Sequence, residues 1–391
     1  MLAANASIIM ASAGAQSPPV LIGSAKLAAT GAVDGFAIFH QIVTTQEAVV
    51  PLETRHASSY LLPFDNTGNL VLGVALTNIS ARFVQVVIRD ETGALIPLPP
   101  DQQSIEVAGG DHYQFGLAAQ FPVTANMRGT IEFDTPQDSL FAVLRLRFTP
   151  PNNALTTIPA LANVGTGGGS FAHLASGGDG WQTTFVLVNS GTSAAPFTLS
   201  FYADQTGLPQ QLPLSFPQPG GGTNTMATSV TQVLPAGATR LIVSSGAPQL
   251  ITGSAQLNTN GNVSGFVIFR HNNQEAVVPL ESRNAGAYIL AFDNTSGTAT
   301  GIAVNAVSAG QVDIPVTVRD AAGATIATDT ITLNANGHTQ FTLVTDKYPM
   351  TADIRGTIEF RTPAGSQIGA LGIRIPNVPA HTYTTLPALA K

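Results

Sequence analysis

The feature that most constrains the fold of this chain is a long internal repeat. The eight residues of segment 46–53 (QEAVVPLE) recur without change at 274–281. Further matches at nearly the same spacing pair 64–67 with 292–295, 128–133 with 355–360, and 156–162 with 384–390. A repeat of this length indicates that the chain is built from copies of one structural unit.

A second, fainter repeat divides the long one in two. Segment 185–202 has the same layout of apolar residues as 302–319, and segment 253–269 matches 356–375. We therefore expect units of about 110 residues, an ordinary domain size. Their expected boundaries are 54–162, 163–281 and 282–391.

The residues before these units match only the second half of a unit. Residues 2–14 align with 234–246, and residues 23–39 align with 253–269. Counterparts of residues 170–233 are missing from this alignment. We therefore expect residues 1–53 to form a truncated first unit.

Within each unit, the apolar residues follow the period of a β-strand. At 197–202, for example, Phe, Leu and Phe alternate with Thr, Ser and Tyr, as a half-buried strand requires. Asn-Gly turn signals separate such runs, and no window has a sustained apolar stripe at helical spacing. The sequence predicts an all-β protein made of tandem antiparallel β-sandwich domains, immunoglobulin-like or fibronectin-like in layout, with the strand order left open.

The charge composition excludes some classes of partner. Only 16 residues are Lys or Arg, against 23 Asp or Glu, and the formal net charge is −7. A chain with so few basic residues has no stripe with which to neutralise a phosphate backbone, so we expect no nucleic-acid partner. Its uncharged stretches are interrupted by Pro, Gly, Thr and Gln, so we expect no membrane insertion. There is no cysteine, and hence no disulfide or thiolate metal site.

Several motifs together suggest a resemblance to a known kind of module. They are Gly-Phe-x-Ile-Phe, Glu-Ala-Val-Val-Pro-Leu-Glu, Phe-Asp-Asn-Thr, Arg-Gly-Thr-Ile-Glu-Phe and Thr-Thr-x-Pro-Ala-Leu. In these the chain resembles uncharacterised tandem β-sandwich modules of secreted bacterial surface proteins, over nearly its whole length. The resemblance implies export and a role at or beyond the cell surface. It carries no catalytic residues over to this chain.

No motif of enzyme chemistry is present, and we expect neither an enzyme nor a cofactor. The sequence has no Gly-x-Ser-x-Gly elbow, no His-Glu-x-x-His, no phosphate-binding loop and no calcium loop of the Asp-x-Asp-x-Asp-Gly type. Asp65 and Asp293, each followed by Asn-Thr, are candidate calcium ligands through their side-chain oxygens. Local Asx-turn hydrogen bonds explain both residues as well.

Two sets of charged residues recur in the repeats. The first is predicted to form outward-facing cross-strand salt bridges on a hairpin, with a ligand-contacting strand face as the alternative. It comprises Glu132 with Arg147 and Glu359 with Arg374. The second flanks the prolines at the ends of the QEAVVPLE segments and is predicted to form an interdomain network at a stiff hinge. It comprises Glu53, Arg55, Glu281 and Arg283.

The truncated unit suggests how the chain functions. Half a sandwich leaves open sheet edges and an uncovered apolar face, which strand addition from another chain can close. We expect an extracellular structural protein that self-associates head to tail, with Ile8, Ile9, Met10, Val20, Leu21 and Ile22 in the assembly segment. The alternative is a secreted adhesin or carbohydrate-binding module with surface glycans as partners, in which Trp181, the only tryptophan, stacks on a sugar ring.

Overall fold

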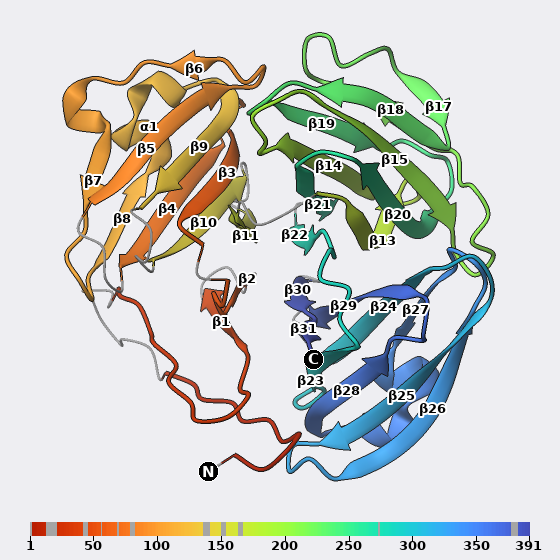
Figure 1. Ribbon diagram of the computed structural model, residues 1–391. Helices are drawn as coiled ribbons and strands as arrows, with labels where there is room; N and C mark the ends of the chain where they lie inside the picture. The colour runs from red at the N-terminus through yellow and green to blue at the C-terminus, as the bar shows by residue number, and fades with distance from the viewer. Residues whose placement is uncertain are drawn as a thin grey trace.

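The computed structural model describes most of the chain. The described residues are 2–12, 22–41, 46–55, 57–68, 70–78, 83–135, 141–149, 154–162, 167–272, 274–376 and 382–391. Nearly all of the regular structure is β-strand, and every strand pairing is antiparallel. The predicted fold class, tandem antiparallel β-sandwiches with internal repetition, is confirmed. Figure 1 shows three sandwiches placed around a common centre.

The first sandwich, unit 1, is built from residues 59–162. One sheet has the strand order β12-β3-β9-β5-β6, with β7 also paired to β5, and the other has the order β11-β10-β4-β8. The elements are β3 (Ser59–Asp65), β4 (Val71–Asn78), β5 (Phe83–Asp90), β6 (Leu95–Ile96), η1 (Pro100–Gln102), β7 (Ser104–Glu106), β8 (His112–Gly116), α1 (Leu117–Gln120), η2 (Pro122–Thr124), β9 (Arg128–Asp134), β10 (Phe141–Thr149), β11 (Ala154–Ile158) and β12 (Leu161–Ala162).

Unit 2 is built from residues 169–279. Its two sheets have the orders β13-β20-β15-β18 and β17-β16-β19-β14-β21-β22. The elements are β13 (Gly169–Ser176), β14 (Gln182–Asn189), β15 (Ala195–Ala203), β16 (Leu212–Ser215), β17 (Thr225–Ala227), β18 (Ser229–Leu234), β19 (Thr239–Ser244), β20 (Ile251–Thr259), β21 (Val263–His271) and β22 (Gln274–Pro279).

Unit 3 is built from residues 287–390. Its sheets have the orders β26-β25-β28-β23-β31 and β27-β24-β29-β30. The elements are β23 (Ala287–Asp293), β24 (Ala299–Val307), β25 (Val312–Asp320), β26 (Thr325–Leu333), β27 (His338–Thr342), the π-helical turn η3 (Leu343–Lys347), η4 (Pro349–Thr351), β28 (Arg355–Arg361), β29 (Gln367–Ile375), β30 (Thr384–Pro387) and β31 (Leu389–Ala390).

Each unit has its own core between its two sheets, because alternate side chains of every strand point inward. In β15 the inward residues Phe197, Leu199 and Phe201 are buried, as the sequence alternation predicts. Strand β21 instead is buried on both faces, and its sequence is a continuous apolar run. Phe269 lies in the sandwich core, whereas Phe266 lies in a separate cluster outside it. A second layer therefore covers the outer face of this sheet.

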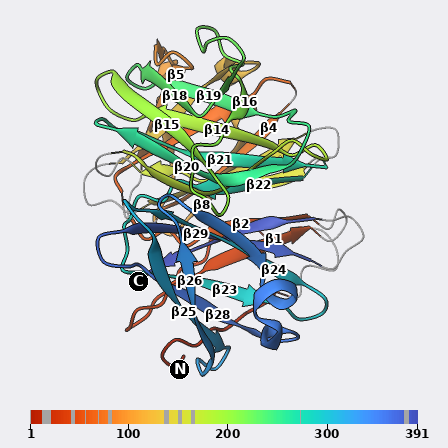
Figure 2. The same cartoon turned by 90° about the vertical axis from the view of Figure 1, so that its right-hand side faces the viewer.

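The N-terminal half-unit is the part of residues 2–51 that the structure describes. Its regular structure is one hairpin, β1 (Phe36–Gln41) paired with β2 (Gln46–Pro51). Residues 7–12, which align with strand β19 of unit 2, form no strand. Figure 1 places this segment, drawn in red, between unit 1 and unit 3, and Figure 2 shows unit 2 above unit 3 in the turned view. Three sandwiches and one half-unit therefore occupy four positions of a ring.

Candidate functional site

Four equivalent strands meet at the centre of the ring. Each is paired with the long strand before it: β2 with β1, β11 with β10, β22 with β21, and β30 with β29. Around the ring, β2 contacts β11, β11 contacts β22, β22 contacts β30, and β30 contacts β2. Figure 1 shows these four strands in the middle of the molecule. The contact of β30 with β2 joins opposite ends of the chain, so non-covalent interactions alone close the ring.

Two of the four contacts use the same hydrogen bond. The Thr157 hydroxyl of β11 donates to the Val49 carbonyl of β2 at 2.5 Å. The Thr385 hydroxyl of β30 donates to the Val277 carbonyl of β22 at 2.6 Å. The half-unit therefore contacts unit 1 as unit 2 contacts unit 3, and the ring has an approximate two-fold symmetry that follows the long sequence repeat.

The other two contacts share a buried ion pair. Arg147 of unit 1 lies 3.0 Å from the Glu275 carboxylate of unit 2, which also accepts a hydrogen bond from the Thr149 hydroxyl. Arg374 of unit 3 lies 2.9 Å from the Glu47 carboxylate of the half-unit. Both carboxylates are almost fully buried. Breaking such a pair leaves an uncompensated buried charge, which makes these pairs strong determinants of which units become neighbours.

Apolar side chains complete the junction between units 1 and 2. Ile158 of β11 packs with Phe266, Ile268 and Val277 of unit 2, and all four are buried. These residues lie outside the sandwich cores. Their burial explains why β21 is apolar on both faces, since a strand covered on both sides loses its polar alternation.

A second contact recurs between neighbouring units, in which one turn docks on another. The receiving turn has a backbone hydrogen bond between its first and fourth residues. Its third residue has a positive φ, which favours Gly or Asn, as in a type II turn. That residue is Asn5 in the half-unit, Gly110 in unit 1, Gly237 in unit 2 and Asn336 in unit 3, with φ of 59°, 84°, 70° and 56°.

The docking turn ends in a glycine that cannot carry a side chain. A Cβ at Gly93 would lie 2.1 Å from the Ala236 carbonyl oxygen, and one at Gly207 would lie 2.0 Å from that of Ala335. At Gly323 the distance to the Ala4 carbonyl oxygen would be 2.6 Å. Unit 1 thus docks on unit 2, unit 2 on unit 3, and unit 3 on the half-unit, each through the same backbone approach.

The half-unit is held on unit 3 as unit 2 is held on unit 1. The Ser7 amide donates to the Ala321 carbonyl at 3.0 Å, and the Thr239 amide donates to the Glu91 carbonyl at 3.1 Å. In addition, the Lys391 ammonium lies 3.3 Å from the side-chain oxygen of Asn5. The half-unit therefore takes the place of a complete unit at this interface.

On its other side the half-unit is open. Five of the six residues of β1 are exposed, and so are the large apolar side chains of Met10, Leu27, Val33 and Phe39. The turn of unit 1 that contains Gly110 is exposed as well, and a Cβ there would meet no atom within 4 Å. Among the four receiving turns that the structure describes, this is the one with no docking glycine against it.

A buried histidine pair lies in the interface of units 2 and 3. The rings of His173 and His338 are stacked, with Nδ1 of His173 3.2 Å from Nε2 of His338. Nδ1 of His338 lies 3.0 Å from the Asp204 carboxylate. Burial and the neighbouring His338 lower the pKa of His173 to about 3. His173 is therefore neutral at physiological pH, and protonation at low pH would destabilise the interface between units 2 and 3.

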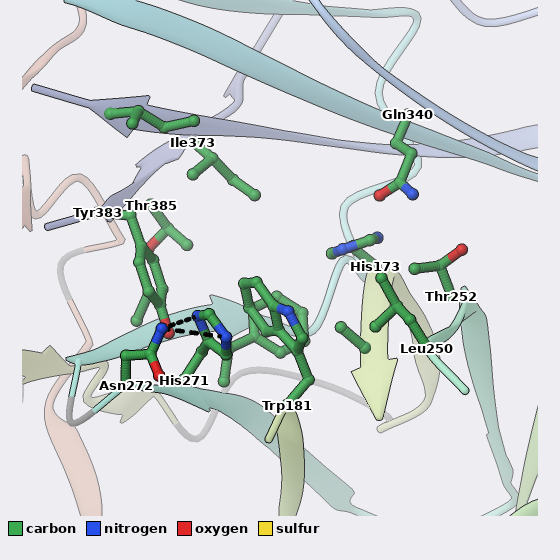
Figure 3. Close-up of a pocket in the computed structure, with 14 residues that line it drawn as sticks. His173, Trp181, Leu250, Thr252, His271, Asn272, Gln340, Ile373, Tyr383 and Thr385 are labelled. Carbon is green, nitrogen blue, oxygen red and sulfur yellow. Dashed lines mark hydrogen bonds between the residues drawn. The ribbon is translucent and has the colours of Figure 1, made fainter. Parts of the chain in front are cut away.

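The same interface contains a pocket of about 440 Å³. The Trp181 indole is stacked on the His271 ring with 4.3 Å between the ring centroids, and the Asn272 amide contacts the same His271 ring. Tyr383 of unit 3 lies 5.8 Å from Trp181, and burial raises the pKa of its phenol. Figure 3 shows these side chains around the cavity, with Ile373 and Gln340 on the unit 3 side. The lining is mostly apolar, which suits a ring or an aliphatic group.

The structure corrects the predicted cross-strand pairs. Strands β9 and β10 belong to different sheets of unit 1, so Glu132 and Arg147 do not form a hairpin pair. Glu132 accepts a hydrogen bond from the Ser59 hydroxyl, and burial, followed by the nearby Asp134, raises its pKa. Arg147 reaches across to unit 2 instead.

The second predicted pair is wrong for the same reason. Strands β28 and β29 lie in opposite sheets of unit 3. Glu359 is buried and pairs with Arg319 and Lys391, at 2.9 and 3.1 Å. Burial acts to raise its pKa, but Lys391 and then Arg319 lower it overall. Arg374 pairs with Glu47 of the half-unit, so the arginine of each predicted pair serves the junction.

The two calcium candidates are engaged by arginines. The Asp65 carboxylate accepts hydrogen bonds from the Thr67 amide and hydroxyl and lies 3.0 Å from Arg128. Asp293 makes the same bonds to Thr295 and lies 3.1 Å from Arg355. These are Asx turns closed by an ion pair, and the guanidinium supplies the positive charge that a cation would bring. Within the described ranges, no group of three or more acidic or His side chains could hold a metal ion.

The residues of the predicted interdomain network pair within each copy and also bond to the neighbouring units. Arg55 pairs with Glu53 and donates to the Ala160 carbonyl of unit 1 at 2.9 Å. Arg283 pairs with Glu281 and donates to the Ala388 carbonyl of unit 3 at 3.0 Å. Each arginine also lies over a buried tyrosine, Tyr60 or Tyr288. The arginines thus fasten the segment between units to the unit that follows it, and the Glu281 backbone exchanges two hydrogen bonds with Ser170 of unit 2, at 2.8 and 3.0 Å.

Of the predicted assembly residues, Ile8, Ile9, Met10 and Ile22 are exposed in the half-unit. Val20 and Leu21 lie outside the described residues. None of the four described residues belongs to a strand. They are therefore free of the sheet pairing that their counterparts in unit 2 make.

Comparison of the chain with known protein families and with curated proteins gave no match. Across the part of the chain that the structure describes, no helix is long and apolar enough to span a bilayer.

Proposed function

We propose that this protein is an extracellular structural subunit that self-associates head to tail through its N-terminal half-unit. The observation that carries the proposal is the non-covalent closure of the ring. The half-unit binds unit 3 through Glu47 and Ser7, and nothing in these contacts requires both partners to belong to one chain. The half-unit of one copy can make them with unit 3 of the next copy, which gives an open, heterologous chain of subunits.

The surface composition supports this role. Only 10% of the residues are charged, against roughly 25% in ordinary soluble proteins, so neighbouring copies repel each other weakly. The motifs shared with tandem modules of secreted bacterial surface proteins favour an extracellular location. The sequence has none of the enzyme motifs considered above, which favours an assembly role over an enzyme.

The ion pair that closes the ring allows a sharp test. Glu47→Arg and Arg374→Glu each place like charges at the interface, and each variant alone has no matched partner. When the two variants are mixed, the half-unit of the Glu47→Arg variant can pair with unit 3 of the Arg374→Glu variant. This pair has opposite charges with the signs reversed, and it can form only between copies. We expect hetero-oligomers in the mixture by analytical ultracentrifugation, and none in either variant alone.

The equivalent pair Arg147 and Glu275 is the matched control, because it joins units that are consecutive in the chain. A mixture of Arg147→Glu and Glu275→Arg should form no hetero-oligomer. The proposal fails if the unmodified protein stays monomeric at high concentration and the Glu47→Arg and Arg374→Glu variants do not associate when mixed.

The pocket beside Trp181 favours a second candidate function, the binding of a surface glycan by an adhesin. An indole in the lining of an apolar cavity of about 440 Å³ is a suitable surface for a sugar ring. One face of this indole is already covered by His271, so a sugar would use the other face. A glycan array, with Trp181→Leu as the control, tests this: binding that survives the substitution, or no binding at all, excludes this site.

A further inference from the structure

Two surfaces of the ring lack the same partner. The first is the open face of the half-unit. Met10 is 84% exposed, whereas its counterpart Ile242 in unit 2 is fully buried. Phe39 is 45% exposed, against 1% for Phe269. Leu27 is 48% exposed, and its counterpart Leu257 is buried.

In unit 2 these counterparts are buried by the first half of the same unit. Their core cluster contains Phe171 of β13, Phe185 of β14, and Phe197 and Phe201 of β15. All of these residues lie within 169–233, the segment that has no counterpart in the half-unit. The chain itself therefore shows which polypeptide covers a face of this kind.

The second surface is the exposed turn of unit 1 at residues 108–111. In unit 2 and unit 3, the residues aligned with Asp111 are Ala238 and Gly337, and both are buried. What buries them is the docking turn that follows the third strand of the preceding unit, and that turn ends in Gly93 or Gly207. For unit 1, the preceding unit is the half-unit, and residues 2–51 contain no counterpart of the third strand or of the docking turn.

We propose that the open face of the half-unit and the turn 108–111 form one docking site for a polypeptide segment with the strand pattern of residues 169–233. The segment adds the strands equivalent to β13 through β18 and closes the fourth sandwich. Its docking turn has the form Asp-x-x-Gly. The final glycine is required because, at the three occupied turns, a Cβ would lie 2.0 to 2.6 Å from a carbonyl oxygen.

This inference rests on the proposed role of the half-unit in assembly and names its partner. It concerns a different surface from the contact with unit 3, because Glu47 and Ser7 lie on the side that faces unit 3. The charge-reversal mixture tests that contact alone. A negative result for the docking site therefore leaves the proposed head-to-tail contact untouched. A negative result for the head-to-tail contact likewise leaves the docking site untouched.

The test supplies the segment at high local concentration by fusion. A copy of residues 167–233 is joined directly ahead of Leu2, which aligns with Leu234, so the register of unit 2 is kept. Hydrogen exchange is measured on the full-length fusion and on the unmodified chain. We expect amide exchange to slow at least tenfold at residues 22–41 and 108–112, and the fluorescence of a dye that binds exposed apolar surface to fall.

Two control fusions separate the two surfaces. Replacing Phe197 and Phe201 by Asp in the added copy alone should abolish protection at both segments. Replacing Gly207 by Val in the added copy alone should abolish protection at 108–112 and leave that of β1. The resident copies of these residues stay unchanged in both controls.

Equal exchange in the fusion and in the unmodified chain overturns the proposal. So does slow exchange of β1 in the unmodified chain that becomes fast on dilution, because a second copy of the chain would then cover the face.

Discussion

The docking turns give the most direct quantitative prediction, through Gly207→Ala. Gly207 has a φ of +66°, and a Cβ there would lie 2.0 Å from the Ala335 carbonyl oxygen. The substitution carries two costs. The left-handed backbone costs an alanine about 1 kcal/mol. The clash with a backbone atom also forces the turn off unit 3.

Losing the docked turn breaks three hydrogen bonds between units, one of which joins the Asp204 carboxylate to Nδ1 of His338 at 3.0 Å. The Gln205 amide donates to the His338 carbonyl at 2.9 Å, and the Asn334 side-chain amide donates to the Gln205 carbonyl at 3.1 Å. At about 1 kcal/mol each, these bonds raise the total loss to roughly 4 kcal/mol.

Gly220→Ala is the matched control. Gly220 has a φ of +70° in the same unit, and a Cβ there would meet no atom within 4 Å. It should cost only the backbone contribution of about 1 kcal/mol. Urea unfolding followed by the fluorescence of Trp181, the single tryptophan, measures both variants. If the two substitutions cost the same within about 0.5 kcal/mol, the docked turn contributes nothing and the reasoning is refuted.

Two buried titratable side chains, His173 and Arg145, give further predictions. His173 is neutral in the fold, because burial and then His338 lower its pKa from 6.5 to about 3. The unfolded chain takes up a proton as the pH falls below about 6.5, so stability should fall by roughly 2 to 3 kcal/mol between pH 7 and pH 4.5. In the His173→Gln variant, the free energy of unfolding measured with urea should change less between pH 7 and pH 4.5. If it changes with pH as in the unmodified protein, His173 is not the group responsible. Asp204, whose pKa is lowered by its bond to His338 although burial opposes this, adds a loss of the same sign below about pH 4. Arg145 is buried, and its Nε and Nη1 donate to no group among the residues that the structure describes. Burial, followed by Arg147, lowers its pKa to about 9. Arg145→Met should therefore raise the free energy of unfolding by roughly 1 to 4 kcal/mol, and a less stable variant would show that the charge is needed.

The sandwich units follow directly from the sequence. Strand alternation is local, and the repeated segments locate the units without knowledge of their partners. The positions of Phe197 and Phe201 in a core are therefore readable from a six-residue pattern. The apolar run of β21 is also visible in the sequence, but the layer that covers its outer face comes from another unit.

The predicted salt bridges failed because local pattern does not say which sheet a strand enters. Glu132 and Arg147 are close in the sequence and lie on consecutive strands, but these two strands belong to different sheets of the sandwich. The true partner of Arg147 is Glu275, more than a hundred residues away. A charged side chain that points away from the core of its own unit would be exposed in an isolated unit. In the ring, the same side chain lies in the interface with a neighbouring unit.

Both kinds of turn that meet between units have recognisable patterns in the sequence. The segments LAANA at 2–6, LPAGA at 234–238 and LNANG at 333–337 share a Leu, an Ala and a Gly or Asn at fixed positions. Asp-x-x-Gly follows the third strand of every complete unit, at 90–93, 204–207 and 320–323. Each pattern reads as an ordinary turn. That the two kinds of turn meet depends on the arrangement of the units.

The half-unit occupies the fourth position of the ring, against unit 3, and both the ring and the proposed assembly depend on this contact. Because the chain has no cysteine, Ser7→Cys with Ala321→Cys introduces a single pair of thiols, at two positions whose backbones are joined by a hydrogen bond of 3.0 Å.

Mild oxidation followed by mass spectrometry of the digested protein is the most direct measurement. We expect a cross-link between these two positions, within one chain in dilute protein and increasingly between chains as the concentration rises. Free thiols at both positions under the same conditions would contradict it.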